Sequence, residues 1–202
     1  MRSVTIIPSK KQREIIIGNI LGDGSLEFNG NIGTRLQIKQ CSRYKDYVFW
    51  LYGKMKNLCN SQPKQRKDNA QWYFSTRSLK ELTSFHRIFY KNKRKIIPKN
   101  ISELLISPLT LAVWYMDDGK LDFRPKDHYA FVLNTDSFLL NEAKILSKVM
   151  QRNFGIQTRV HNSLCRGKRY PKIYIGVEGR DKFLSLIKPY ILNCFSHKIP
   201  PF

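Results

Sequence analysis

The sequence is poor in acidic residues and has no long apolar segment. Only 15 of its 202 residues are Asp or Glu, against 36 Lys or Arg, so the formal net charge is +21. Its apolar runs are far shorter than the about 18 to 20 residues that a membrane-spanning helix needs. No strongly basic amphipathic helix favours binding to a membrane surface. The charge therefore predicts a polyanionic partner, with nucleic acid favoured over an anionic membrane.

Cysteine and histidine are also sparse, with four of each. Their irregular spacing includes no Cys-x-x-Cys motif, which argues against a zinc knuckle or a disulfide framework. Reduced thiols are typical of an intracellular protein. Residues 1–7 lack the apolar core of a signal peptide, so we expect a protein that is not secreted.

The sequence does contain one short phrase twice. Asp23-Gly24-Ser25-Leu26-Glu27-Phe28 returns as Asp118-Gly119-Lys120-Leu121-Asp122-Phe123, each time after an apolar stretch. Ser9 to Gln12 form a capping-box pattern that predicts a helix ending near Gly22. Ser107-Pro108 predicts the start of another helix, which would end near Asp118. Two acidic residues, one in each half, would thus follow two similar helices.

The remaining pattern also repeats. Alternating residues predict strands near 34–40 and 129–133, and periodic residues predict helices near 42–57, 78–90, 136–154 and 180–188. Basic hairpins are expected within 62–75 and 157–175. The sequence therefore predicts an α+β fold of two pseudo-symmetric αββαββα repeats, residues 1–97 and 98–202, joined by a linker at about 91–107. Two sheets side by side would form a saddle.

The repeated aspartates are candidates for a shared site. An acidic residue at the C-terminal end of a helix opposes the helix dipole, and a bound cation would offset that cost. Gly18 and Gly22 lie four residues apart and would let another helix approach closely. If the two helices pack through these glycines, Asp23 and Asp118 converge. Carboxylates without His or Cys suit a hard cation such as Mg²⁺, which commonly acts on phosphate esters.

Residues 16–24 and 111–119 resemble the paired motifs of the LAGLIDADG homing endonucleases, and the similarity extends over nearly the whole chain. The resemblance implies a monomer that cleaves both strands of a long asymmetric DNA site across the minor groove. It implies Asp23 and Asp118 as ligands of Mg²⁺ or Mn²⁺, with Ca²⁺ as a non-catalytic substitute. Gly22 and Asp117 are further candidate ligands, although an accessory or structural role is favoured for Asp117. Gly18, Gly22 and Ala112 are the expected helix interface.

The resemblance also implies polar residues near the attacking water, here Gln40 and Asn134. Lys172 is the candidate basic residue that completes the site, and Gln71 is its expected counterpart in the first repeat. The family favours small residues where this chain has Val113 and Asp117, so the two helices need not pack symmetrically.

A two-stranded ribbon fits the major groove of DNA, which identifies outward-facing strand residues as candidate readers of bases and phosphates. The candidates are Arg35, Gln37, Lys39, Lys64, Arg66, Arg159, His161, Lys168 and Tyr174. Two alternatives stay open: an RNA maturase that assists splicing of a host intron, and a non-catalytic DNA-binding protein of the same fold. The resemblance and the Lys, Asn and Ile usage favour an organelle or a bacterial cytoplasm.

Overall fold

The computed structural model describes residues 6–30, 33–124, 128–165 and 167–201. Residues 1–5, where no signal peptide is expected, lie outside this part. The described elements repeat the same order twice, which confirms the expected α+β fold class. The first set is α1 (Lys10–Leu21), β1 (Ser25–Phe28), β2 (Thr34–Gln40), α2 (Lys45–Met55), β3 (Lys64–Gln65), β4 (Trp72–Ser75) and α3 (Lys80–Phe89). The second is α5 (Pro108–Asp118), β7 (Gly119–Arg124), β8 (His128–Asn134), α6 (Leu140–Phe154), β9 (Arg159–Cys165), β10 (Lys168–Ile175) and α7 (Arg180–Ile187).

The segment between the two sets has structure of its own. It contains a short hairpin, β5 (Tyr90–Lys91) and β6 (Arg94–Lys95), followed by α4 (Ile101–Leu104). Asn92 and Lys93 both have positive φ, as the tight turn of a two-residue hairpin requires. The expected linker is therefore a folded connection that holds residues 94–97 in place.

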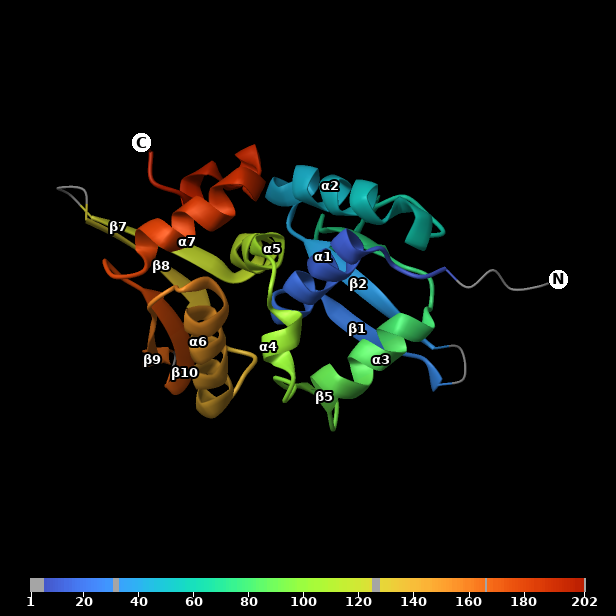
Figure 1. Cartoon of the computed structure of the whole chain (residues 1–202). Coiled ribbons are helices and arrows are strands. Elements are labelled where there is room, and N and C mark those ends of the chain that lie inside the picture. Colours follow the sequence, from blue (N-terminus) through green and yellow to red (C-terminus); the bar gives the residue numbers. More distant parts are fainter. Residues whose placement is uncertain (1–5, 31–32, 125–127, 166, 202) are drawn as a thin grey trace.

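Two antiparallel sheets flank a central pair of helices (Figure 1). Their strand orders, β1-β2-β4-β3 and β7-β8-β10-β9, are equivalent. Along β2, Leu36 and Ile38 are buried, whereas Arg35, Gln37 and Lys39 are at least partly accessible. This alternation places one face of the sheet on the core and leaves the polar face open.

The helix starts follow the expected capping chemistry, with one exception. The Ser9–Gln12 capping box and the Ser107 cap are both present. The helix expected from Asp136 begins instead at Leu140, because residues 135–138 form a turn closed by the Phe138 N–H and the Thr135 carbonyl at 2.9 Å. The Leu139 N–H is satisfied by the Glu142 carboxylate at 2.7 Å, which marks the true start of α6.

Helices α1 and α5 are the centre of the core. Residues 15–21 and 109–116 are all buried, so both helices are covered nearly all round. A Cβ added to Gly18 would lie 2.7 Å from the Val113 Cβ, and one added to Gly22 would lie 2.5 Å from the Asp117 Cβ. The glycines therefore make room for the larger residues of α5, so the packing of the two helices is asymmetric. Ala112 is fully buried, but the α5 atoms nearest to Gly18 belong to Thr110 and Val113.

No helix in the described part of the chain is long and apolar enough to span a membrane.

Candidate active site

The C-terminal ends of α1 and α5 bring three aspartates together. The Asp23 N–H donates to Asp117 Oδ2 at 3.2 Å, across the interface between the two helices. Gln40 Nε2, at the end of β2, donates to Asp23 Oδ2 at 2.9 Å and lies 3.4 Å from Asp117 Oδ1. The buried Tyr47 hydroxyl donates to Asp117 Oδ1 at 2.9 Å. Asp117 is thus held by three residues of the other repeat, a contact that the sequence did not reveal.

The polar residues expected beside the two aspartates do not occupy equivalent positions. Glu27 and Asp122 each lie four residues after a repeated aspartate, and they pair with Arg35 and Ala130. Arg35 and Ala130 are therefore equivalent positions of the two repeats. Counting on from them along β2 and β8 aligns Asn134 with Lys39. It aligns Gln40 with Thr135, whose buried hydroxyl donates to the Pro171 carbonyl at 2.7 Å.

The consequence is a difference in what the two amides hold. Gln40 binds the Asp23 carboxylate, whereas Asn134 Nδ2 donates to the main-chain oxygen of Asp118 at 3.0 Å.

Two lysines complete the site, and neither was predicted from the sequence as an active-site residue, although Lys95 belongs to the basic run 91–95 that was expected to hold phosphates. Lys95 Nζ donates to the Gly22 carbonyl at 2.7 Å, and Lys198 Nζ donates to the Met116 carbonyl at 2.6 Å. Each lysine donates to a carbonyl oxygen at the C-terminal end of its helix, and these carbonyls have no hydrogen-bond partner within the helix. A signal was available in the matching segments Lys95-Ile96-Ile97-Pro98 and Lys198-Ile199-Pro200.

Burial and crowding of like charges perturb the acidic groups. Burial, and then the neighbouring Asp23 charge, raise the pKa of Asp118 to about 7. The same two causes raise the pKa of Asp117 well above its usual value. Burial lowers the pKa of Lys95 and of Lys198, although the nearby aspartates oppose that change. The two lysines therefore do not balance the negative charge of the three carboxylates at neutral pH. A bound cation would relieve the repulsion between the carboxylates.

The donor atoms fit a hard divalent cation bound together with substrate. In the described residues no group of three or more His, Cys, Asp or Glu side chains could hold a metal alone. The site instead offers the carboxylates of Asp23 and Asp118 and the main-chain oxygens of Gly22 and Asp117, which in this structure accept from Lys95 at 2.7 Å and from Lys198 at 3.4 Å. Mg²⁺ commonly binds one or two carboxylates, keeps several waters and takes further oxygens from phosphates. The oxygen-only set fits this pattern, with Asp117 placed to fix Asp23.

The expected DNA-contacting residues lie on the open faces of the two sheets. One groove is lined by Gln37, Lys39, Gln65, Arg66, Lys67, Asp68 and Tyr73, and another by Arg124, Val132, Arg159, His161, Ser163, Lys172 and Tyr174. Lys64 pairs with Tyr73 beside the first groove, and Lys168 is exposed at the start of β10. Ion pairs hold three of the arginines: Arg35 with Glu27, Arg66 with Asp68 and Arg159 with Glu178.

Lys172 lines the second groove and pairs across the strands with Asn134 and His161. In the first sheet, Tyr73 pairs with Lys39, the residue aligned with Asn134. The counterpart of Lys172 is therefore Tyr73. The expected counterpart, Gln71, was wrong because the sequence does not display the register of the strand pairs.

Comparisons with known proteins agree with this arrangement. The model of the LAGLIDADG DNA endonuclease family matches residues 13–183. A cytochrome b mRNA maturase bI2 of Debaryomyces hansenii is 30% identical over 94% of this chain and 74% of its own length. DNA endonuclease I-ChuI of Chlamydomonas applanata is 27% identical over 95% of both chains. The structure of homing endonuclease I-WcaI bound to its DNA recognition sequence superposes with a TM-score of 0.82 and 26% identity, covering 96% of this chain and 88% of that one. The chain is thus a member of the LAGLIDADG DNA endonuclease family.

Proposed function

We propose that this chain is a site-specific endonuclease that cuts both strands of a long, asymmetric DNA duplex with a divalent metal, Mg²⁺ or Mn²⁺. The observation that carries the proposal is that Asp23 of the first repeat bonds Asp117 and lies close enough to Asp118 of the second repeat to raise its pKa, where two helices end between two basic sheet faces. The net charge of +21 favours a polyanionic substrate. I-WcaI, which has the same fold, is bound to DNA in its structure.

The metal would polarise a phosphoryl oxygen, activate water and stabilise the leaving oxygen. Asp23 and Asp118 would hold it with the main-chain oxygens of Gly22 and Asp117. Structures of I-DmoI, which share the fold at TM-scores of 0.54 and 0.53, are complexes with DNA and Mn or DNA and Ca. We propose Ca²⁺ as a substitute that supports binding without cleavage.

The remaining side chains have distinct proposed roles. Gln40 would orient Asp23 and Asn134 would serve the second centre, where each amide would hold the attacking water. Lys95 and Lys198 are positioned to donate to phosphate oxygens, where a charged donor stabilises the transition state. Lys172 lies on the open face beside Asn134 and would reach the DNA backbone from there. The two non-identical grooves would read the two halves of an asymmetric site.

Cleavage of a plasmid by Asp23→Asn and Asp118→Asn tests the proposal. The target is first selected from random duplexes by binding in Ca²⁺, and cleavage is then measured in Mg²⁺. Each variant keeps its fold and its DNA affinity but loses about 1,000-fold or more in double-strand cleavage, because several kcal/mol of charge stabilisation disappear. Full double-strand cleavage by either variant would exclude a shared metal site. Tight binding by the wild type without cleavage would identify a non-catalytic DNA-binding protein instead.

The similarity to a cytochrome b mRNA maturase favours a second candidate function, assistance in splicing of a host intron. Splicing rescue by the Asp118→Asn protein would separate this role from cleavage. A monomeric state and a location in an organelle or a bacterial cytoplasm remain part of the proposal.

A further inference from the structure

The two lysines of the candidate active site lie on two short segments, which we call straps. The first strap is residues 94–97, at the end of the first repeat, and the second strap is residues 193–198, near the end of the second. Lys95 contacts the end of α1, and Lys198 contacts the end of α5. Each lysine therefore contacts the motif helix of its own repeat. Each strap also has a contact within its own repeat, because Lys95 pairs with Tyr90 and the Tyr115 hydroxyl donates to the Lys198 carbonyl at 2.6 Å. In addition, each strap contacts the opposite repeat.

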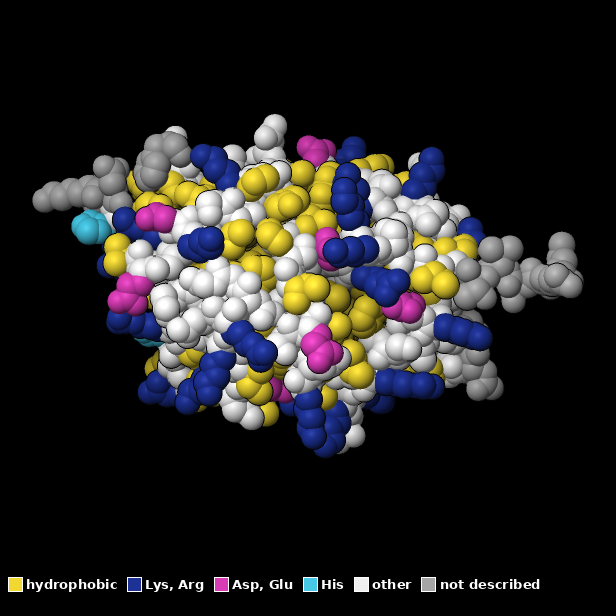
Figure 2. Space-filling view, in the orientation of Figure 1, with side chains coloured by type: hydrophobic (Ala, Val, Ile, Leu, Met, Phe, Trp, Pro, Cys, Tyr) yellow, Lys and Arg dark blue, Asp and Glu magenta, His cyan; other side chains and the backbone are white. Residues whose placement is uncertain are grey.

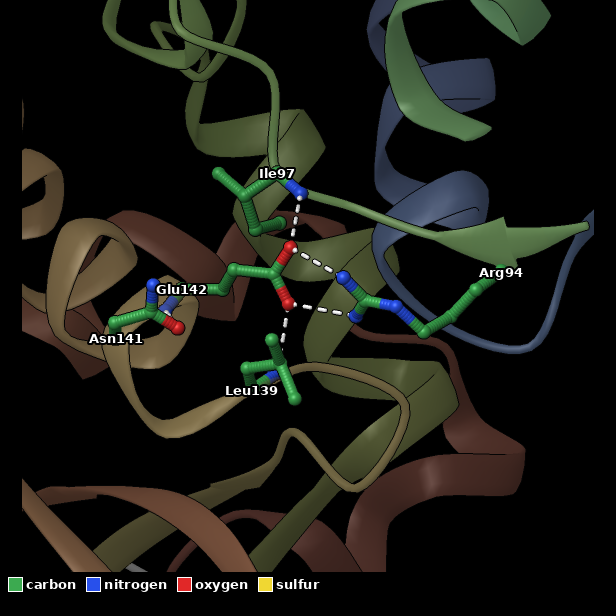
Figure 3. A network of polar contacts seen from close by, with 5 residues as sticks. All are labelled: Arg94, Ile97, Leu139, Asn141 and Glu142. Carbon is green, nitrogen blue, oxygen red and sulfur yellow. Dashed lines mark hydrogen bonds and ion pairs between the residues drawn. The ribbon is translucent and has the colours of Figure 1, made fainter. Parts of the chain in front are cut away.

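The first strap is held by an ionic contact with α6 (Figure 3). Arg94 donates to both carboxylate oxygens of Glu142, at 2.9 and 3.3 Å, and the Ile97 N–H donates to Glu142 Oε1 at 3.3 Å. The Glu142 side chain is only 9% exposed. Burial opposes its ionisation, but the bonds from Arg94 and from the Leu139 and Ile97 N–H groups outweigh burial and lower its pKa. Glu142 thus grips the strap on both sides of Lys95.

The second strap is held by aromatic contacts with the start of α2. Phe195 is buried, stacks on Tyr44 at 4.6 Å between ring centroids and meets the edge of Tyr47 at 5.0 Å. The Tyr44 hydroxyl lies 3.4 Å from His197 Nε2, next to Lys198 in sequence. Lys198 Nζ itself lies 5.0 Å from the centre of the Phe195 ring. These contacts fix the strap just before the point where Lys198 turns toward α5.

The two holding sites occupy matching places in the repeats. Tyr47 is the third residue of α2, and Glu142 is the third residue of α6. Tyr44 and Leu139 precede these helices as their N-caps. The same structural position therefore carries an aromatic grip in one repeat and an ionic grip in the other.

We propose that Glu142 and Tyr44 are positioning residues, each of which controls the cleavage of one DNA strand by placing a lysine of the opposite repeat. Glu142 acts through Arg94 on Lys95, and Tyr44 acts through Phe195 on Lys198. This inference rests on the proposed two-strand cleavage. Each active centre would then depend on residues of both repeats. Cleavage of one DNA strand could be slowed without slowing the other, by substitutions at residues that do not contact the aspartates.

The test uses the full-length chain and a supercoiled plasmid with one selected target. The variants are Arg94→Gln, Glu142→Gln and Tyr44→Ala. Arg13→Gln is the control for Arg94, because Arg13 forms an ion pair with Glu81 at 3.6 Å inside the first repeat. Tyr52→Ala is the control for Tyr44, because Tyr52 packs on Phe74 inside the same repeat. Strand-labelled duplexes identify which strand each variant cuts.

Arg94→Gln and Glu142→Gln should slow the same strand by about 100-fold, the loss expected for a misplaced catalytic group. Nicked circles accumulate, while the other strand and the DNA affinity keep wild-type values. Tyr44→Ala should slow the opposite strand, and both controls should cut as the wild type does. The double variant Arg94→Gln/Glu142→Gln should be no slower than either single variant, because the two residues form one contact.

A second readout needs neither DNA nor metal. Reductive methylation followed by peptide mass spectrometry measures how accessible each lysine is. Arg94→Gln should expose Lys95 and leave Lys198 unchanged, and Tyr44→Ala should do the reverse. Equal slowing of both strands, or unchanged lysine accessibility with unchanged strand rates, would overturn the proposal. A wild type that never cuts would contradict the proposed function, and the methylation pattern would still decide which repeat holds each strap.

Discussion

The ends of α1 and α5 differ at the residue that precedes the repeated aspartate. In α1 this residue is Gly22, and in α5 it is Asp117. The glycine leaves space that the Asp117 side chain fills, and Asp117 in turn accepts the Asp23 N–H. The repeats are therefore complementary at the seam, the interface between the ends of α1 and α5, where the first repeat provides the space and the second provides the side chain.

The same lesson holds away from the seam. Gln40 binds a carboxylate where Asn134 binds a main-chain oxygen, and Glu142 stands where the first repeat has Tyr47. Figure 2 shows Lys and Arg side chains spread over the helix-covered face as well, so positive charge alone does not mark the site. The aspartates and the strap lysines match between the two halves, whereas the residues that hold them differ.

Substitution of the two strap lysines should have the largest effect on cleavage. Lys95→Met and Lys198→Met should each reduce cleavage by about 100- to 1,000-fold, as removal of a single transition-state donor does in other enzymes. Single-turnover rates on strand-labelled duplexes measure the effect. Lys172→Met is the matched control on the open sheet face, and it should mainly weaken DNA binding. A larger loss for Lys172→Met than for either strap lysine would restore Lys172 as the basic catalytic group.

The glycine and aspartate at the seam offer a test of complementarity. Gly22→Ala should destabilise the fold by about 1 to 3 kcal/mol, because a buried interface has no room for the added methyl group. Gly53→Ala on α2 is the control, since nothing lies within 4 Å of its added Cβ. That change should stabilise the helix by up to about 1 kcal/mol. Urea unfolding measures both.

Asp117→Gly, which removes the Cβ that lies 2.5 Å from the added methyl group, should rescue part of the Gly22→Ala loss if the two residues compete for the same space. No rescue would mean that the cost arises elsewhere in the helix.

The pH dependence of stability tests the charge crowding around Asp118. The raised pKa of Asp118, about 7 against 3.8, means that its stabilising contribution is complete at low pH and disappears as the pH rises to about 7. An upper limit is about 4 kcal/mol, and partial exposure of the side chain reduces it. The metal-free protein should therefore melt at lower temperature at pH 8 than at pH 5.

Thermal melts of the wild type and of Asp118→Asn measure this effect. The melting temperature of the variant should rise relative to that of the wild type by about 2 to 4 °C per kcal/mol, and this difference should grow between pH 4 and 7. Mg²⁺ should narrow the gap if a cation relieves the repulsion. A gap that does not change with pH would show that Asp118 titrates normally.

Much of the fold was predictable because its signals are local. The capping box at Ser9, the cap at Ser107 and the alternation along residues 34–40 each depend on neighbours within a few residues. The match between Lys172 and Gln71 failed because it needed the register between strands. Register depends on pairing between segments that are distant in sequence.

The sequence by itself determined the repeat, the positive charge and the two aspartates at the ends of similar helices. Only the tertiary structure decided which residues meet those aspartates. Tyr47 and Asp117 are 70 residues apart, and Lys95 reaches Gly22 across 73 residues. Such contacts form because close packing of α1 on α5 and the docking of each strap on the opposite repeat bury groups that must then find partners. The periodicity of apolar residues along the chain does not predict those partners.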